Sequence, residues 1–306
     1  MTSPAPDISV VLPVFNGGKF LNEAISSIRN QTFRSFELII LNDGSTDQSI
    51  EVIKMHAAAD PRIVVVDREN KGLVATLNEG VRLAKADFIA RMDADDICAP
   101  HRFAKQVEYF TCYPECVAVG SRVELIDPEG LPIRLMVDGL KHEEIDTLNL
   151  QGQGLAIAHP TVMFRREAAL QVEGYRIDYK HAEDVDFFLR MAEVGILANL
   201  KDVLLQYRQH SNSVGYAHAL AQMQSARAAA RDALQRRRLP VPSVLNTKND
   251  AIVGMPSDAD IHRKWVWWSL SGGNRKTARK HVFKAICKEP LSLKNFRPLF
   301  CTLRGY

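Results

Sequence analysis

The sequence lacks the features of a membrane-spanning, secreted or disulfide-stabilised protein. No apolar run approaches the roughly 20 residues that a membrane-spanning helix needs. The opening MTSPAPD has neither the basic stretch nor the apolar core of a secretory signal, so no such signal is expected. Only 5 of the 306 residues are cysteine, and only Cys112 and Cys116 lie close together. Without a second cysteine pair or a histidine cluster, they predict free thiols in a reducing compartment and no zinc site.

The composition is that of an ordinary soluble globular protein, with 46% hydrophobic and 25% charged residues. The net charge of +3 hides a division along the chain. Residues 1–226 contain 22 Lys and Arg against 31 Asp and Glu, whereas residues 227–306 contain 17 against 5. If the basic C-terminal segment has a partner, this charge predicts an anionic one.

The first hundred residues alternate between two kinds of segment. Short apolar runs typical of buried strands cover residues 8–15, 37–41, 62–66 and 87–92. Apolar residues recur at helical spacing over residues 20–28, 45–56 and 73–84. This alternation predicts right-handed βαβ units and a parallel sheet with helices on both faces. Ligands of such sheets bind at the carboxyl ends of the strands.

The rest of the chain is less regular. Strand-like runs cover residues 117–126, 161–164 and 203–207, and helical patterns cover 100–110, 183–194 and 217–238. Residues 127–155 are turn-rich and weakly patterned. Pro240 and Pro242 then interrupt the chain, and short helices are expected beyond them. We predict an α/β domain over residues 1–216 and a basic helical extension over residues 217–306, with Trp265, Trp267 and Trp268 in its core.

Polar clusters follow each of the first four predicted strands. Asn, Asp and Gly are the usual turn residues at strand ends, so one such cluster alone indicates little. The cluster after the fourth strand is different, because Asp93, Asp95 and Asp96 place three carboxylates within four residues. These groups repel one another unless a cation lies among them, and hard oxygen ligands suit Mg²⁺ or Mn²⁺. The sequence therefore predicts a divalent metal site here.

In order and spacing, a series of segments resembles the family 2 glycosyltransferases over about residues 7–215. The segments are SVVLPVFN from Ser9, NDGSTD from Asn42, NKG from Asn70, DAD from Asp93, HPTVMF from His159, ED at Glu183 and YRQH from Tyr207. The resemblance implies a GT-A fold, which is a nucleotide-binding α/β/α sandwich with a mixed, mostly parallel sheet. It also implies inverting transfer of a sugar from a nucleotide diphosphate.

The resemblance implies which residues bind the donor. Phe15 and Asp43 should border the base, with the Asp43 carboxylate accepting a hydrogen bond from a ring N–H. Asp93 should face the ribose. Phe15 stands where tyrosine is more frequent, so it keeps the ring face and loses the hydroxyl. The implied donor-binding set is completed by Pro13, Asn16, Asn70 and Ala94.

The resemblance also implies the metal ligands and the base. Asp95 should hold a Mn²⁺ or Mg²⁺ ion that bridges the two phosphates, with His210 completing the site and Asp96 ranked behind Asp95. Asp184 should be the general base. A bound cation stabilises the charge that gathers on the leaving diphosphate. A carboxylate must take the acceptor proton, because a hydroxyl is a poor nucleophile near neutral pH.

Partners and location follow from the same resemblance. It implies a nucleotide-diphosphate sugar, most commonly of the UDP type, as donor. It implies a glycan or lipid-linked acceptor in bacterial surface polysaccharide or lipopolysaccharide synthesis, on the cytoplasmic face. For the basic extension two alternatives stay open: peripheral contact with anionic membrane, or a solvated cap on the catalytic domain. No motif for nucleic acid accompanies it, so no nucleic acid partner is expected.

Two other functions remain as alternatives. A sugar nucleotidyltransferase would need a Gly-rich loop with Arg and Lys after the first strand, whereas residues 16–20 hold one Lys and no Arg. A catalytically inactive sugar-nucleotide-binding module would have lost the Asp-x-Asp segment or the base, and both are present.

Overall fold

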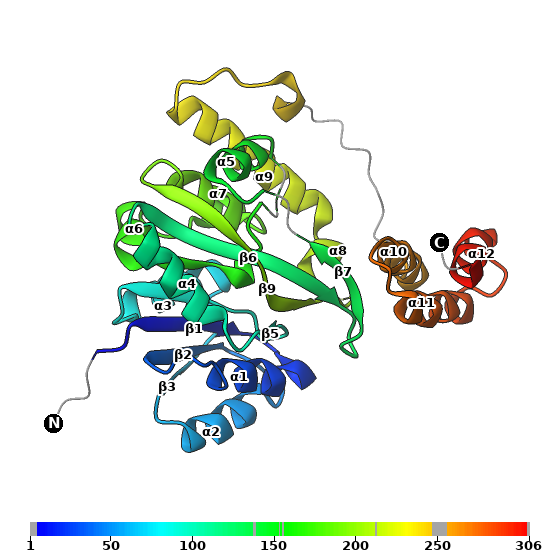
Figure 1. The fold of residues 1–306 in the computed structure, drawn as a ribbon, viewed down its shortest axis with the longest axis horizontal. Coiled ribbons are helices and arrows are strands. Elements are labelled where there is room, and N and C mark those ends of the chain that lie inside the picture. The colour runs from blue at the N-terminus through cyan, green and yellow to red at the C-terminus, as the bar shows by residue number, and fades with distance from the viewer. Residues whose placement is uncertain are drawn as a thin grey trace.

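The computed structural model describes residues 5–136, 139–152, 154, 156–211, 213–246 and 256–304 (Figure 1). The strands are β1 (Ile8–Val14), β2 (Phe36–Asp43), β3 (Ile63–Arg68), β4 (Phe88–Arg91), β5 (Ile97–Cys98), β6 (Cys116–Ile126), β7 (Pro132–Met136), β8 (Met163–Arg165) and β9 (Ile196–Arg208). The α-helices are α1 (Leu21–Arg29), α2 (Ser49–Ala59), α3 (Leu73–Leu83), α4 (Arg102–Cys112), α5 (His142–Leu150), α6 (Arg166–Gln171), α7 (Glu183–Met191), α8 (Val214–Ala217), α9 (Ala219–Arg236), α10 (Asp258–Ser271), α11 (Arg275–Lys288) and α12 (Phe296–Arg304).

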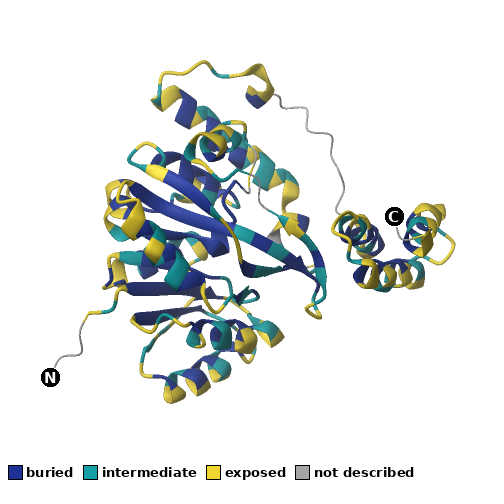
Figure 2. Ribbon diagram, viewed as in Figure 1, coloured by how far each residue is buried: buried dark blue, intermediate teal, exposed yellow. Residues whose placement is uncertain are grey.

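The N-terminal half of the sheet is parallel. Strand β1 pairs with β2 on one side and β4 on the other, and β2 pairs with β3. Every residue of β1 is buried (Figure 2), because helices cover both faces of the sheet. Apolar side chains of α1 and α4 pack on one face, and those of α3 and α7 pack on the other. The predicted strand–helix alternation and the α/β/α sandwich are confirmed.

Strand β8 makes the sheet mixed. It lies between β4 and β6 and is antiparallel to both, whereas β6 runs parallel to β9 along a long register. The strand order is β3-β2-β1-β4-β8-β6-β9-β5, with β7 paired to β6. The longer pairings are parallel ones, which agrees with the mixed, mostly parallel sheet predicted from the resemblance.

The turn-rich stretch 127–155 contains two regular elements that its pattern did not predict. Strand β7 returns antiparallel along β6, across a turn in which Asp127 Oδ1 accepts hydrogen bonds from the N–H groups of Glu129 and Leu131. Helix α5 follows. Pro128 and Gly130 do mark a turn, but this turn joins the two strands of a hairpin. Strand β7 is short and only partly buried, so its apolar and polar residues do not alternate clearly.

Helices α9, α10 and α11 pack against elements of the first 216 residues. The alanine face of α9 packs on α7, while α10 and α11 lie beside β7 (Figure 1). Asn274 Nδ2 and Thr277 Oγ1 donate to β7 carbonyls at 2.9 and 2.6 Å. Trp265 is buried as predicted, and its Nε1 donates to the Tyr216 hydroxyl at 2.7 Å, whereas Trp267 is exposed. The division of the chain at residue 216 stays a prediction.

None of the described helices combines the length and the apolarity that crossing a membrane requires.

Candidate active site

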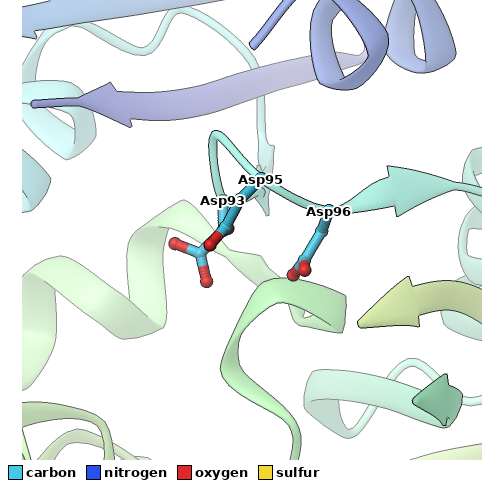
Figure 3. A group of neighbouring side chains, drawn as sticks. All are labelled: Asp93, Asp95 and Asp96. Atoms are coloured by element: carbon cyan, nitrogen blue, oxygen red, sulfur yellow. The ribbon is translucent and has the colours of Figure 1, made fainter. Parts of the chain in front are cut away.

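Three carboxylates gather where the chain leaves β4. Asp93, Asp95 and Asp96 point to the same side of this turn (Figure 3), and one oxygen from each lies within 4.8 Å of the others. The turn lies at the carboxyl end of β4, as expected of a ligand site in a sheet of this kind.

The charges in this cluster are not balanced within the chain. Burial, together with the charge of Asp95, raises the pKa of Asp93 and raises that of Asp96 well above its ordinary value. Asp96 is fully buried, and its Oδ1 accepts from the Arg208 N–H at 2.8 Å, but its Oδ2 has no hydrogen-bond partner within the described residues. A buried carboxylate oxygen without a partner is costly. These oxygens therefore fit a hard divalent cation.

Two buried arginines hold the acidic turn, and the sequence analysis assigned a role to neither. Arg91 Nη1 lies 2.6 Å from Asp93 Oδ2. Arg208 Nε donates to the backbone carbonyl of Asp95 at 2.8 Å, and its Nη2 contacts Glu23 at 2.6 Å. Arg208 lies within the YRQH segment, so that motif could have indicated a role for it. Arg91 carried none beyond its place in a buried strand.

His210 reaches the same cluster from the end of β9. Its Nε2 lies 2.9 Å from Asp95 Oδ2, and its ring stacks on Phe20 at 5.8 Å between centroids. The structure thus brings together the two residues that the resemblance assigned to the metal. Imidazole nitrogens and carboxylate oxygens are both common ligands of divalent metal ions.

A cavity of about 1160 Å³ opens over the carboxyl ends of β1, β2 and β4. Phe15 is 56% exposed on its wall. Helices α10 and α11 reach the same cavity through Asp258, His262, Trp265 and Lys288. All seven residues predicted to bind the donor line it: Pro13, Phe15, Asn16, Asp43, Asn70, Asp93 and Ala94.

Three of these residues also fix the loops around the cavity. The Asp43 carboxylate accepts from the N–H groups of Lys71 and Gly72 at 2.8 and 3.0 Å and pairs with Arg68. Asn70 Nδ2 donates to the Asp43 carbonyl at 2.8 Å. Asn16 Oδ1 accepts from the Thr46 N–H at 2.8 Å. The turns after β1, β2 and β3 are therefore tied together. Arg68 is a participant that the sequence analysis missed.

A second cavity, of about 620 Å³, meets the first at the acidic cluster. Asp93, Asp95 and His210 line both cavities, and Asp184 lines the second. Burial raises the pKa of the Asp184 carboxyl, and its Oδ1 accepts from the Val185 N–H at 2.9 Å. Asp184 therefore shares a solvent space with Asp93, Asp95 and His210.

The two acids beside Asp184 are placed differently. Burial and the Asp184 charge raise the pKa of Glu183 to about 7, and Glu183 lines neither cavity described above. The Asp186 carboxylate is buried in an ion pair with Arg190, with Oδ2 2.9 Å from Nε. Of the three acids at the start of α7, Asp184 is the one that faces the second cavity.

Basic side chains to which the sequence assigned no role also line the first cavity. They are Lys180, His181 and His218, and the two imidazoles stack 4.3 Å apart at an interplanar angle of 7°. Burial lowers the pKa of His181, with the neighbouring His218 and Lys180 adding to the effect. The only sequence signal was the position of Lys180 and His181 just before the Glu183–Asp184 pair.

Comparison with known proteins bears on both the fold and the family. The family described as glycosyl transferase family 2 matches residues 9–172. The O-antigen biosynthesis glycosyltransferase WbnJ of Escherichia coli is 33% identical over 237 residues, covering 76% of this chain and 91% of that protein.

Two solved structures share the fold at low sequence identity. S. aureus TarS 1-349 in complex with UDP has a TM-score of 0.60 at 14% identity, covering 89% of this chain and 82% of that one. The mannosyltransferase PcManGT from Pyrobaculum calidifontis, in complex with GDP-Man and Mn²⁺, has a TM-score of 0.58 at 17% identity, covering 99% and 81%. These likenesses confirm the predicted GT-A fold.

Proposed function

This chain belongs to glycosyl transferase family 2, and on that premise we propose that it transfers a sugar, with inversion, from a nucleotide diphosphate to an acceptor hydroxyl. One observation carries the proposal. Asp93, Asp95 and His210 lie on the wall between two cavities, and Asp184 lies on the second. A donor in the first cavity and an acceptor in the second would meet at the acidic cluster.

We place the nucleotide in the first cavity. Phe15 offers an exposed ring for stacking on a base. The Asp43 carboxylate already accepts from two backbone N–H groups and Arg68, so its remaining lone pair would accept from the base. The UDP and GDP-Man bound by TarS and PcManGT support a nucleotide sugar as donor, and we favour the UDP type.

We propose Asp95 as the principal ligand of a Mn²⁺ or Mg²⁺ ion, with His210 beside it. The partnerless oxygen of buried Asp96 and the raised pKa of Asp93 support a cation here. When bound, such an ion supplies Lewis-acid stabilisation of the leaving diphosphate. Arg208 and Arg91 keep the ligand oxygens in place before the donor arrives.

Asp184 is the proposed general base. Its carboxylate would take the proton from the acceptor hydroxyl as that oxygen attacks the anomeric carbon on the face opposite the diphosphate. One displacement with one base and no covalent intermediate inverts the configuration. The raised pKa of Asp184 suits proton transfer near neutral pH.

The acceptor we propose is a glycan or lipid-linked sugar of a bacterial surface polysaccharide, and the O-antigen role in the name of WbnJ supports this. Helix α12 supports peripheral membrane contact (Figure 2). Helix α12 packs on α10 and α11 with its Pro298 and Thr302 buried. Its Phe296, Phe300 and Leu303 are 72, 55 and 71% exposed. Residues 290–304 contain three basic residues and no acidic one. Such a surface suits anionic lipid.

A panel of UDP-, GDP- and dTDP-sugars, each with Mn²⁺, with Mg²⁺ or with chelator, tests the proposal. We expect divalent-dependent release of a nucleoside diphosphate from at least one donor, slow with water and faster with an acceptor. Binding of donors without any release would indicate an inactive module. Pyrophosphate formed from a nucleoside triphosphate and a sugar phosphate would indicate a nucleotidyltransferase.

A further inference from the structure

A pair of cations lines the second cavity, beside one aromatic ring. Arg134 of β7 and Lys264 of α10 both line this cavity together with Asp184. The Arg134 guanidinium carbon lies 4.8 Å, and Lys264 Nζ 4.5 Å, from the ring centre of Trp268. Within the described part of the chain, neither side chain forms an ion pair.

Several other basic side chains of the C-terminal segment are neutralised by acidic partners. Acidic partners lie against Arg236, Arg237, Arg263, Lys280, Lys284 and Lys288. By contrast, Arg134 Nε is buried and has no hydrogen-bond partner among the residues that the structure describes, and Nη2 lies 3.9 Å from the Met136 sulfur. Burial and the nearby Arg134 lower the pKa of Lys264. Two like charges held together in this way favour binding of an anion.

The distance between the cation pair and the acidic cluster is suited to a bound acceptor. Arg134 is in register with Leu125 of β6, which is in register with Tyr207 of β9. Two strand spacings therefore separate Arg134 from Tyr207, about 10 Å between Cα atoms. Tyr207 immediately precedes Arg208, which holds the Asp95 turn. An anion at Arg134 is thus close to the reacting centre yet leaves room for a sugar unit.

We propose that Arg134 and Lys264 form a subsite for the phosphate of a phosphorylated acceptor, whose sugar hydroxyl then faces Asp184. This inference rests on the proposed function and names the class of its acceptor. A phosphate diester carries one negative charge and a diphosphate diester carries two, which two cations can neutralise, and the arginine fork binds phosphate through paired N–H groups. The acceptor is therefore a sugar joined to its carrier through phosphate or diphosphate, rather than a neutral glycan.

The competing explanation is structural: both cations could serve only to stack on Trp268 and hold α10 against β7. Cation–π contacts of this kind would then stabilise the fold. This alternative predicts that substitutions lower the unfolding midpoint without changing the binding of any phosphate.

The test uses the full chain with its donor cavity filled by saturating UDP and Mn²⁺. Glucose 1-phosphate is titrated and followed by tryptophan fluorescence, since Trp268 contacts both cations, and methyl glucoside serves as the neutral probe. We expect the phosphate to bind measurably tighter than the glucoside. Arg134→Gln and Lys264→Gln should each raise the Kd about tenfold or more. The exposed-residue controls Lys276→Gln and Arg279→Gln should leave the Kd unchanged.

The outcomes separate the possibilities. Equal Kd values in wild type and in both Gln variants overturn the subsite, as does equal binding of the two probes. Arg134→Lys keeps the charge, so it should weaken binding less than Arg134→Gln even if the latter folds poorly. Wild-type protein that binds UDP with Mn²⁺ but not glucose 1-phosphate contradicts this inference alone. Failure to bind any nucleotide diphosphate contradicts the proposed function instead.

Discussion

His210 places its Nε2 2.9 Å from Oδ2 of Asp95, although 115 positions separate the two residues in the chain. The contact depends on β9 lying beside β5, because Arg208 at the end of β9 binds both the Asp95 carbonyl and the Asp96 carboxylate. The acidic turn is therefore a meeting point of both halves of the sheet. Its geometry is fixed by buried hydrogen bonds and not by the turn sequence alone.

Replacing Asp95 should remove activity and leave the fold intact. The Asp95→Ala variant loses the proposed principal metal ligand at a strand end, outside the apolar core. We expect divalent-dependent sugar transfer to vanish while the unfolding midpoint without metal stays close to that of wild type. Asp87→Asn, at the opposite end of β4 and exposed, is the matched control. Full activity of Asp95→Ala, or of wild type in excess chelator, contradicts the metal assignment.

Replacing Asp184 should slow the chemical step selectively. An amide cannot accept the acceptor proton, so Asp184→Asn should lower kcat by at least about 10²-fold. The Kd of the nucleotide sugar should change little, since Asp184 lines only the second of the two cavities. Asp178→Asn, on an exposed turn nearby, is the control. A variant that keeps its kcat but binds donor poorly would show that Asp184 is a binding residue.

Asp186, two residues further on, should matter for stability. Its carboxylate and the Arg190 guanidinium are both buried, and removing one partner leaves an uncompensated charge. Asp186→Asn should lower the free energy of unfolding by about 3–5 kcal/mol in urea titrations. Loss of under about 0.5 kcal/mol, the usual effect at exposed sites, would mean that this ion pair is unimportant.

The acidic cluster could be predicted from the sequence, whereas the residues that hold it in place could not. Asp93, Asp95 and Asp96 stand out because strand ends in parallel sheets share one edge, so local sequence and topology agree. Arg91 and Arg134 carry no such signal: each lies inside a strand, and its role depends on a partner brought close only by the fold. Nonlocal packing of this kind has no counterpart in the spacing of residues.

The same limit applies to the last helix. The positions of Phe296, Phe300 and Leu303 form a stripe at helical spacing, which ordinarily predicts a buried face. In the structure the buried side of α12 carries Pro298 and Thr302 instead. This spacing indicates an amphipathic helix but does not tell which side packs on α10 and α11, because that depends on the surface those helices present.

Stability should depend on pH through Glu183. Its pKa rises from 4.5 to about 7 in the folded chain, so the folded state binds more protons than the unfolded state between these values. The contribution of Glu183 to the free energy of unfolding is therefore fully present below about pH 4.5 and is lost as the pH rises through 7. Glu183→Gln cannot ionise at this position. Its unfolding midpoint should therefore rise relative to that of wild type as the pH increases from 5 to 8. A difference independent of pH would contradict the raised pKa.

The exposed stripe of α12 should attach the chain to anionic membranes. Each Lys or Arg near such a surface contributes about 1 kcal/mol, and the apolar side chains add to this. Co-sedimentation with vesicles that contain anionic lipid should therefore be strong at 0.1 M salt. It should weaken at 1 M, because the Debye length falls from ~10 to ~3 Å.

A double substitution in the exposed stripe tests whether the stripe itself binds the membrane. Phe300→Ser combined with Leu303→Ser should reduce sedimentation severalfold without lowering the unfolding midpoint, because both side chains are exposed. Ile177→Ser is the matched control, since Ile177 is 73% exposed but lies outside α12. Sedimentation that is unaffected by the double substitution, or by salt, would leave α12 as a cap on the catalytic domain. A change in oligomeric state, measured by light scattering without lipid, would instead assign the stripe to a second copy of the chain.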